Sequence, residues 1–512
     1  MVERILEEEQ TVKKYILTVL CLALMCGVVE ADETSYPLGL KEALRLAVER
    51  NLDLRAQLYT PAMNEADVRF NRGIYDPHLT LTTGYTDTRS IPVSTITTGG
   101  IGKLHQQTFT VDPGINQLFP TGATVGLDFS NYYSTTNAPS SIAKDSYWQS
   151  ALTLNVSQPL LKNFGRDATE LGIAVALGTK EGSVYHYQSQ VLATVLQVKT
   201  EYYKLYYDYE DLESKRVSLK DAQRILSDTK ARVKAGVLPA MEVLNAEFGV
   251  ASREKDLNDA ERSVQDESDV LRLLLQLDVK DVIRPTDKPG SERIETSEDG
   301  AIKKALAARP ELKEARTGIK TSEIQARVAK NNTLPNLNLV ASAGLNGLGS
   351  GYGRDMDRLS SANYPAWSIS LQFDYPLGNT AAENSYIKSK LKVSQGETQL
   401  QSQQETIANE VRAAIRALAS SYKQIEVTDR ARAYAEENLR AYIRRSEVGL
   451  ATIKDVLDVE NTLATARSNH NKALTDYNTA MNQYWKATGE LLDREGIIIS
   501  DKEVDGLYDR TR

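Results

Sequence analysis

Two stretches of sequence, 213 residues apart, decide how this chain is organised: AGVLPAMEVLNAEFGV at 235–250 and VGLATIKDVLDVENTL at 448–463. Gly236 aligns with Gly449, and a run with apolar residues at helical spacing follows each glycine. Glycine commonly ends a helix, because it adopts the left-handed backbone conformation that other residues adopt only at a cost. The chain therefore contains the same turn between two helices twice.

The duplication extends over most of the chain. Matched residues recur at spacings of 258, 258 and 217 residues: Ala43 and Ala301, Pro77 and Pro335, and Pro159 and Pro376. Self-similarity at long, nearly constant spacing indicates an internal repeat. We therefore expect a tandem duplication of one structural unit.

Each repeat has the same predicted order of parts. A short helical segment comes first (Leu38 to Tyr75; Gly300 to Thr333) and ends just before a proline. Strands follow, and then a long helix, Arg166 to Lys234 in one copy and Thr380 to Val448 in the other. About 70 helical residues form a rod of roughly 100 Å, too long for a compact domain. After the turn glycine, a second helix returns.

The strands alternate apolar and polar residues, as in Leu152, Leu154 and Val156 or Ile369, Leu371 and Phe373. This period of two, with Thr, Ser, Asn, Asp and Gln between the apolar residues, is typical of membrane β-barrels. The first repeat has 82 residues between its boundary prolines and the second only 41. The first therefore holds either two strands with long loops or four strands, and the sequence leaves open whether the added hairpin joins a barrel.

The first 31 residues predict a signal peptide. Lys13 and Lys14 precede an apolar run from Tyr15 to Val29, and a small residue, Ala31, marks a cleavage site. The alternative is a transmembrane anchor, but about 15 apolar residues are fewer than the roughly 20 that span a bilayer. Cys21 and Cys26 both lie in this segment, so no disulfide is expected in the mature chain; lipid attachment at either cysteine and the true start codon stay open.

Other chemistry is not indicated. The net charge of -8 and the scattered basic residues exclude an electrostatic footprint for nucleic acid. His78, His105, His186 and His470 are too dispersed for a metal site, so we expect no metal, no cofactor and no enzymatic activity. Gly347, Gly349, Gly351 and Gly353 follow a strand, but no helix is expected to open there, and we interpret them as a surface loop at a hairpin end.

The duplicated order of parts resembles the TolC family of outer membrane efflux proteins. The residues that carry this resemblance are QPL at 158–160, YPL at 375–377 and VGLATIKDVLD at 448–458, and it extends from about Leu38 to Leu491. It implies an α+β membrane protein that forms a homotrimer. Its strands would form one transmembrane β-barrel in the outer membrane, continued by a long α-helical barrel through the periplasm.

The expected segments follow in order along the chain. They are a signal peptide (1–31), a short helical segment (32–77), strands with an extra hairpin (78–158), long and short helices (159–278), a linker (279–299), a second short helical segment (300–335), a β-hairpin (336–375), long and short helices (376–492) and a C-terminal tail (493–512).

The resemblance also implies site residues at the two turns. Asp455 and Asp458, three residues apart on one helical face, would line a pore constriction together with Glu242, and rings of such carboxylates attract cations. An adaptor would dock on Val448, Gly449, Leu450, Ala451 and Thr452 and, in the first copy, on Gly236 and Val237. Leu238 and Pro239 depart from the second copy, so the two docking grooves need not be equivalent. Pro77, Pro159, Pro335 and Pro376 mark the strand-helix joints.

The implied function is a passive exit duct of a tripartite efflux or type I secretion system. Its expected partners are two further copies of the chain, a periplasmic adaptor protein, an inner-membrane transporter and outer membrane lipid, with no nucleic acid. The alternative is a periplasmic coiled-coil spacer without channel activity, because the helices are rich in Ala, Leu, Glu, Lys and Gln. A barrel protein would require detergent for extraction, whereas a spacer would not.

Overall fold

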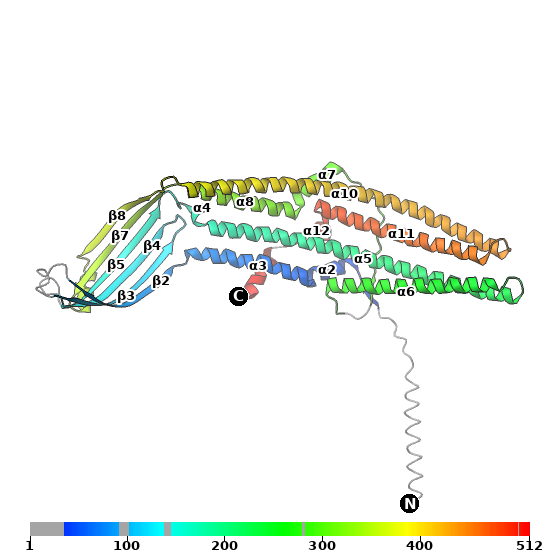
Figure 1. The fold of residues 1–512 in the computed structure, drawn as a ribbon, viewed down its shortest axis with the longest axis horizontal. Coiled ribbons are helices and arrows are strands. Elements are labelled where there is room, and N and C mark those ends of the chain that lie inside the picture. The colour runs from blue at the N-terminus through cyan, green and yellow to red at the C-terminus, as the bar shows by residue number, and fades with distance from the viewer. Residues whose placement is uncertain (1–34, 92–101, 138–144, 279–281, 500, 512) are drawn as a thin grey trace, which may run out of the picture. The chain divides into compact units, whose positions relative to one another are not determined.

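A computed structural model describes residues 35–91, 102–137, 145–278, 282–499 and 501–511, without the side chains of 35 and 501–504. The expected signal peptide, with Cys21 and Cys26, lies outside the described residues. The chain forms two compact units. Unit 1 contains the described parts of 1–52, 192–298 and 412–495, and unit 2 those of 53–191, 299–411 and 496–512. Figure 1 shows their helices and strands.

A six-stranded antiparallel sheet dominates unit 2 (Figure 1). Its strands, in spatial order, are β2 (His78–Ser90), β3 (Leu104–Leu118), β4 (Thr124–Thr136), β5 (Ser146–Pro159), β7 (Asn336–Gly349) and β8 (Pro365–Asp374). The added hairpin of the first repeat thus belongs to the same sheet as the other strands. Strands β5 and β7 join the two repeats, with Leu152 opposite Leu345.

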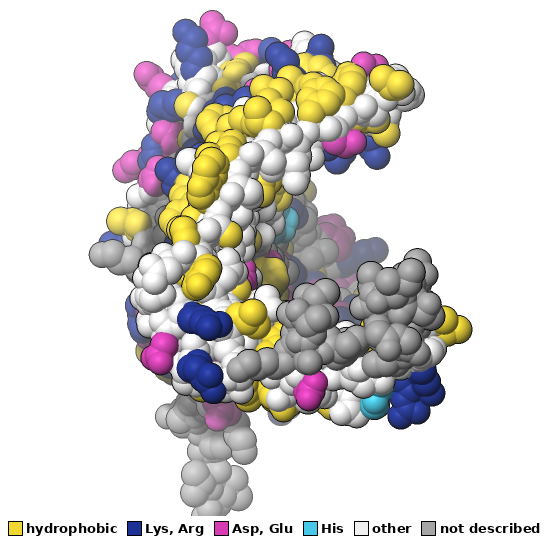
Figure 2. Space-filling model, turned by 90° about the vertical axis from the view of Figure 1, so that its left-hand side faces the viewer, with side chains coloured by type: hydrophobic (Ala, Val, Ile, Leu, Met, Phe, Trp, Pro, Cys, Tyr) yellow, Lys and Arg dark blue, Asp and Glu magenta, His cyan; other side chains and the backbone are white. Residues whose placement is uncertain are grey.

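The sheet has one apolar and one polar face, because side chains alternate along each strand. We define the apolar face by cross-strand neighbours that include Leu79, Leu81, Tyr85, Phe109, Ile115, Leu127, Phe129, Tyr133, Trp148, Leu152, Leu154, Val156, Leu337, Leu339, Leu345, Trp367, Ile369, Leu371 and Phe373. The polar face carries Thr80, Thr82, Asp112, Asp128, Thr153, Asn155, Ser342, Ser368 and Gln372. Hydrophobic side chains follow the convex side of the curved sheet (Figure 2).

The glycine-rich stretch differs from the expected surface loop, because Gly347 and Gly349 end strand β7 and Gly353 lies in a helix. We expected a loop without a helix, but helix α9 (Tyr352–Ser360) begins directly after Gly351. The sequence signal for this helix is weak, because nine residues span only two to three turns. The side chain of Asp355 in α9 is fully buried.

The four boundary prolines lie at the ends of strands. Pro77 and Pro335 directly precede β2 and β7, Pro159 is the last residue of β5, and Pro376 follows β8 after one intervening residue. A proline at a strand end removes no ladder hydrogen bond from the sheet interior, which explains why it is tolerated there.

Each short helical segment is two helices rather than one. The first comprises α2 (Leu40–Arg50) and α3 (Leu52–Arg72), followed by the single turn η1 (Gly73–Tyr75), and the second comprises α7 (Glu298–Ala308) and α8 (Pro310–Asn331). Asn51 and Arg309, at the two breaks, have ψ of 124°. Arg309 precedes Pro310, and a residue before proline is disfavoured in the helical conformation.

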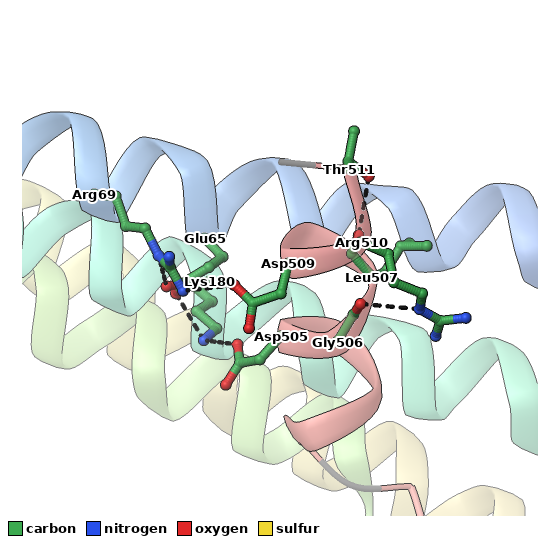
Figure 3. A network of polar contacts seen from close by, with 9 residues as sticks. All are labelled: Glu65, Arg69, Lys180, Asp505, Gly506, Leu507, Asp509, Arg510 and Thr511. Carbon is green, nitrogen blue, oxygen red and sulfur yellow. Dashed lines mark hydrogen bonds and ion pairs between the residues drawn. The ribbon is translucent and has the colours of Figure 1, made fainter.

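The C-terminal helix α13 (Asp501–Thr511) contacts α3 and α5 within unit 2 (Figure 3). Lys180 Nζ lies 2.8 Å from Glu65 Oε2 and 2.9 Å from Asp505 Oδ1. Leu507 packs against Ala62 and Val184. Burial alone would raise the pKa of Glu65, but hydrogen bonds from Lys180 and Arg69 lower it. The tail beyond the duplicated part is therefore a docked element of unit 2.

Unit 1 contains helical hairpins. Helix α5 (Leu171–Lys234), which begins in unit 2 after α4 (Arg166–Thr169), is followed by α6 (Met241–Leu275). Helix α10 (Thr380–Glu447), which also begins in unit 2, is followed by α11 (Ile453–Thr488) and α12 (Leu491–Arg494). Ion pairs between α5 and α6 and between α10 and α11 join the helices of each hairpin, as in Lys230–Glu247 and Arg467–Glu436.

Two four-residue strands were not expected from the sequence. Strand β1 (Ser35–Leu38) pairs in parallel with β6 (Val282–Pro285), which lies in the segment interpreted as a linker. Runs this short carry little periodicity. The hydroxyl of the buried Tyr202 donates a hydrogen bond to the Leu38 carbonyl and accepts from the Thr286 and Asp287 N–H groups. Among the described helices, none is long and apolar enough to cross a bilayer.

Candidate functional site at the two helix turns

The two turns have the same backbone hydrogen bonds. In the first, Val237 N–H donates to Arg232 O (2.9 Å) and Gly236 N–H to Val233 O (2.9 Å). In the second, Leu450 N–H donates to Arg445 O (2.8 Å) and Gly449 N–H to Ser446 O (3.3 Å). Both patterns are Schellman motifs, which require a left-handed residue after the helix. Gly236 and Gly449 supply it with φ of 75° and 77°.

The turns differ in how the next helix begins. In the second turn, the Thr452 hydroxyl accepts from Asp455 N–H (3.1 Å), and Asp455 Oδ2 accepts from Thr452 N–H (2.9 Å). This reciprocal capping box satisfies two N–H groups that a helix start otherwise leaves unpaired. In the first turn, α6 begins after Ala240 without a side-chain cap. The sequence difference at Leu238 and Pro239 therefore changes the local structure.

The three predicted constriction carboxylates lie on α6 and α11. Asp455 and Asp458 are exposed on α11, one turn apart, and Glu242 is half-buried in the first turn of α6. The hydroxyl and the backbone N–H of Thr452 lower the pKa of Asp455 by donating hydrogen bonds to its carboxylate. Asn245 Nδ2 lies 3.5 Å from Glu242 Oε2. Within one chain, Asp455 is therefore held both ionised and in a fixed orientation.

An apolar cluster supports the helices behind the turns. Ala246 on α6 packs with Ile453 and Leu457 on α11, and three partly buried residues pack against them: Ile225, Leu226 and Leu238. Gly249 lies so close to α11 that a Cβ there would be 3.0 Å from Leu457 Cδ1. The second helices of the two repeats are thus in direct contact.

A buried ion pair also joins these helices. Arg253 Nη2 on α6 lies 3.0 Å from Glu460 Oε2 on α11, and the exposed fractions of the two side chains are 9% and 6%. The Ser218 hydroxyl on α5 donates to Glu460 Oε1. Removing one partner of a buried pair leaves an uncompensated charge, so these residues hold three helices together.

Exposed apolar side chains surround the turns. Val448 and Leu450 are 70% and 78% exposed, and Val237 is 70% exposed. A further stripe on α6 was not singled out from the sequence: Met241, Leu244 and Phe248. Its signal was available, because a spacing of three and then four residues places them on one helical face. Contiguous exposed apolar side chains often mark a protein-protein contact.

A cavity of about 350 Å³ lies beside the second turn, between α5, α10 and α11. Its lining includes Arg232, Leu439, Ile443, Ser446, Ile453 and Val456. Arg232 Nη1 donates to Ser446 O (3.3 Å), which connects the ends of the two long helices. The cavity is thus lined by both apolar and charged residues. It lies at the same end of unit 1 as the predicted docking residues.

A second polar cluster lies further along α5. The buried Glu267 of α6 forms an ion pair with Lys204, and burial together with Glu267 raises the pKa of Glu201. Burial, followed by the Glu267 carboxylate, raises the pKa of Asp208 to about 7. Among the residues that the structure describes, no group of three or more His, Cys, Asp or Glu side chains could hold a metal ion.

The family of the chain follows from comparison with known proteins. Residues 43–275 and 301–490 match the family model described as outer membrane efflux protein. Over 346 residues the chain is 25% identical to outer membrane protein TolC of Vibrio cholerae, covering 65% of this chain and 77% of TolC. Over 327 residues it is 23% identical to the probable efflux pump outer membrane protein TtgC of Pseudomonas putida, covering 62% of this chain and 64% of TtgC.

The fold is also that of a solved channel. The structure superposes on the Campylobacter jejuni CmeC outer membrane channel with a TM-score of 0.61 and 16% identity, over 92% of this chain and 89% of CmeC. With both halves of the duplication inside the matched residues, the chain belongs to the outer membrane efflux protein family and is an outer membrane protein with a periplasmic extension.

Proposed function

We propose that this chain is the passive exit duct of a tripartite efflux or type I secretion system. The sheet carries the proposal: one face is mainly apolar, with Asn131 and Ser150 as buried polar residues on it, and the other face is polar. A sheet of this kind is stable in a bilayer only when it closes, since an open edge would leave backbone groups unpaired in lipid. The apolar face would contact lipid, and the polar face would line an aqueous channel.

Closure needs further copies of the chain. Within the described sheet, β2 and β8 are edge strands, each paired along one side only. Pairing β8 of one copy with β2 of the next in a homotrimer would close six strands per chain into an eighteen-stranded barrel. Barrels of 16–18 strands leave a water-filled interior. The family resemblance implies four strands per chain and a twelve-stranded barrel, so the proposed barrel is wider.

The helix turns would form the periplasmic end. In a trimer, Asp455 and Asp458 would each form a ring of three carboxylates at the constriction, with Glu242 adding a third ring. Such rings attract cations and repel anions. The Thr452 hydrogen bonds support this role for Asp455, because they keep its carboxylate ionised and oriented.

The same end would bind the periplasmic adaptor. The exposed apolar side chains of Val448, Leu450 and Val237 are suited to a protein partner, as is the adjacent cavity along α10 and α11. Gly449, Ala451, Thr452 and Gly236 would shape the docking turns. An inner-membrane transporter, connected through the adaptor, would supply the energy, and the duct itself would only conduct.

Extraction and reconstitution test this function against the spacer alternative. The full chain should require detergent for release from outer membranes and should have the mass of three chains. Reconstituted into liposomes, it should release a trapped small cation. A chain that leaves the membrane fraction in salt buffer, or a trimer that releases nothing even when the helix turns are loosened by Glu460→Gln, would contradict the proposal.

A further inference from the structure

Helix α9 lies against the apolar face of the sheet. A Cβ placed on Gly347 would lie 2.5 Å from the Asp355 backbone oxygen, and one on Gly349 would lie 2.5 Å from the Asp355 nitrogen. Gly347 and Gly349 alternate along β7 with the same period as Leu345, and so belong to the apolar face. These two glycines therefore make room for a helix that rests directly on β7.

The contact covers a polar site within the apolar face. Ser150 on β5 is opposite Gly347, is 1% exposed and donates a hydrogen bond to Asp355 Oδ2. Without α9, this hydroxyl, which lies opposite the buried Asn131 of β4, would be a polar group on a face of mainly Leu, Val and aromatic side chains. This hydrogen bond between two buried side chains therefore attaches α9 to the apolar face at a defined position.

Helix α9 lies at the end of a row of aromatic side chains. Tyr85, Phe109, Tyr133 and Trp148 are successive cross-strand neighbours on four strands, and Gly349 follows Trp148 in the same row. Tyr352 of α9 contacts Trp148 edge to face, with ring centroids 5.3 Å apart. Aromatic girdles on membrane barrels mark the level of the lipid headgroups. This row therefore places α9 at that level.

The outward side of α9 is charged. Arg354 and Arg358 are exposed and one helical turn apart, with the exposed Asp357 beside them. Arg358 Nη1 donates to Leu348 O, whereas Arg354 forms no ion pair with another described residue. An amphipathic helix with basic residues on its polar side is typical of binding in the plane of a membrane interface.

We propose that α9 is an interfacial helix that binds the anionic phosphate headgroups of outer-leaflet lipids through Arg354 and Arg358. The inference rests on the proposed function, because the apolar face must contact lipid. Trp148 is near the end of β5 that is distant from Pro159 and the helices. With the helices in the periplasm, this end is at the external surface. A lipid partner is favoured over a protein, since α9 continues the surface that the bilayer already covers.

Lipid binding is measured on the full chain in nanodiscs of phosphatidylcholine mixed with phosphatidylglycerol. The double variant Arg354→Gln, Arg358→Gln should retain phosphatidylglycerol about thirtyfold more weakly by native mass spectrometry, given the usual contribution of each basic residue near a membrane surface. The matched control is Lys388→Gln, Lys392→Gln, which removes two exposed charges at the same spacing from α10. Arg354→Gln alone, which breaks no hydrogen bond or ion pair within the described residues, should show about a fivefold loss.

Three results would overturn the inference. They are unchanged phosphatidylglycerol retention in Arg354→Gln and the double variant, an equal loss in the lysine control, and displacement of the lipid by inorganic phosphate alone, which would indicate a soluble-anion site.

The depth of α9 is measured separately, with spin labels on single cysteines in a Cys21→Ala, Cys26→Ala background. A label at Leu371→Cys on the apolar face should be accessible to oxygen only, and one at Asp357→Cys both to oxygen and to a water-soluble nickel complex. If the label at 371 is accessible to oxygen only but the label at 357 is accessible to the nickel complex only, the inference is overturned, whereas the proposed function is not contradicted. If both labels are accessible to the nickel complex only, the proposed function is contradicted as well.

Discussion

Arg253 and Glu460 form a buried ion pair that connects the second helix of one repeat to the second helix of the other. The pair lies behind the two helix turns, next to the contact between Gly249 and Leu457. If the turns open because α6 separates from α11, the Arg253–Glu460 ion pair must break. The stability of the turns and the conductance of the proposed duct are therefore linked through these two residues.

Glu460→Gln should destabilise the helices and loosen the turns. The substitution leaves the buried Arg253 guanidinium with only Asp256, 3.8 Å from its Nη1, as a counter-charge, so we expect a cost near the lower end of the about 3–5 kcal/mol that is typical of a broken buried pair. Thermal unfolding followed by circular dichroism should begin several degrees lower than in the wild type. The control is Lys230→Gln, which breaks an exposed pair with Glu247 and should cost roughly 0–1 kcal/mol. Equal unfolding temperatures for the two variants would show that the buried pair has no special role.

Gly449→Ala should lower the stability of the second turn by about 1 kcal/mol, because alanine is strained at a φ of 77°. Gly449→Asn should cost less, since asparagine tolerates this conformation better. Gly318→Ala is the opposite control: Gly318 lies within α8 with open space around it, so alanine should be neutral or stabilising there. Hydrogen exchange of the α10 C-terminus measures the effect, and equal exchange in Gly449→Ala and wild type would contradict it.

Asp208 should make unit 1 less stable as the pH rises. Its pKa is about 7 in the folded chain and near the ordinary aspartate value when unfolded, so the folded state binds the extra proton between these two values. Stability is then highest in the acidic part of this window, decreases as the pH rises to about 7 and is constant above it. Asp208→Asn should exceed the wild type in stability by less at pH 5 than at pH 8, because the wild type loses stability throughout this window. Asp228→Asn, at an exposed position on the same helix, should change neither value.

Asp505→Asn should weaken the docking of α13. The substitution removes one of the two carboxylates that contact Lys180 Nζ (Figure 3). Because Asp505 is partly exposed, we expect a loss of about 1 kcal/mol, or roughly fivefold faster exchange of the α13 amides. Arg510→Gln removes a charge whose hydrogen bond stays within α13, and it should leave exchange nearly unchanged. Identical exchange in the two variants would mean that the ion pairs do not hold the tail.

The features of the fold that occur in both repeats could be predicted from the sequence, because each was seen twice. The turn glycines, the boundary prolines and the alternating strands each occur twice, and in the structure Gly236 and Gly449 have the same φ and the same hydrogen bonds. The placement of the added hairpin was not accessible, because strand pairing depends on partners distant in the chain. Strand β1, strand β6 and helix α9 were missed for a related reason: each is short, and α9 depends on glycines in β7 that admit Asp355.

The candidate site was only partly predictable. Sequence spacing put Asp455 and Asp458 on one helical face, but it did not reveal that Asp455 also caps α11 through Thr452. The Arg253–Glu460 pair joins residues 207 positions apart, which no local pattern indicates. The Met241, Leu244 and Phe248 stripe was visible as a pattern, but its exposure depends on which side of α6 the other helices cover.

Single-channel conductance in a planar bilayer tests the central claim most directly. Purified wild-type trimers should give small, discrete and cation-selective currents, and the Asp455→Asn, Asp458→Asn variant should conduct with its cation selectivity largely lost. Glu460→Gln, which loosens the turns, should conduct more than wild type. Folded, membrane-inserted trimers that pass no current in the wild type, in the aspartate variant and in Glu460→Gln would contradict the account.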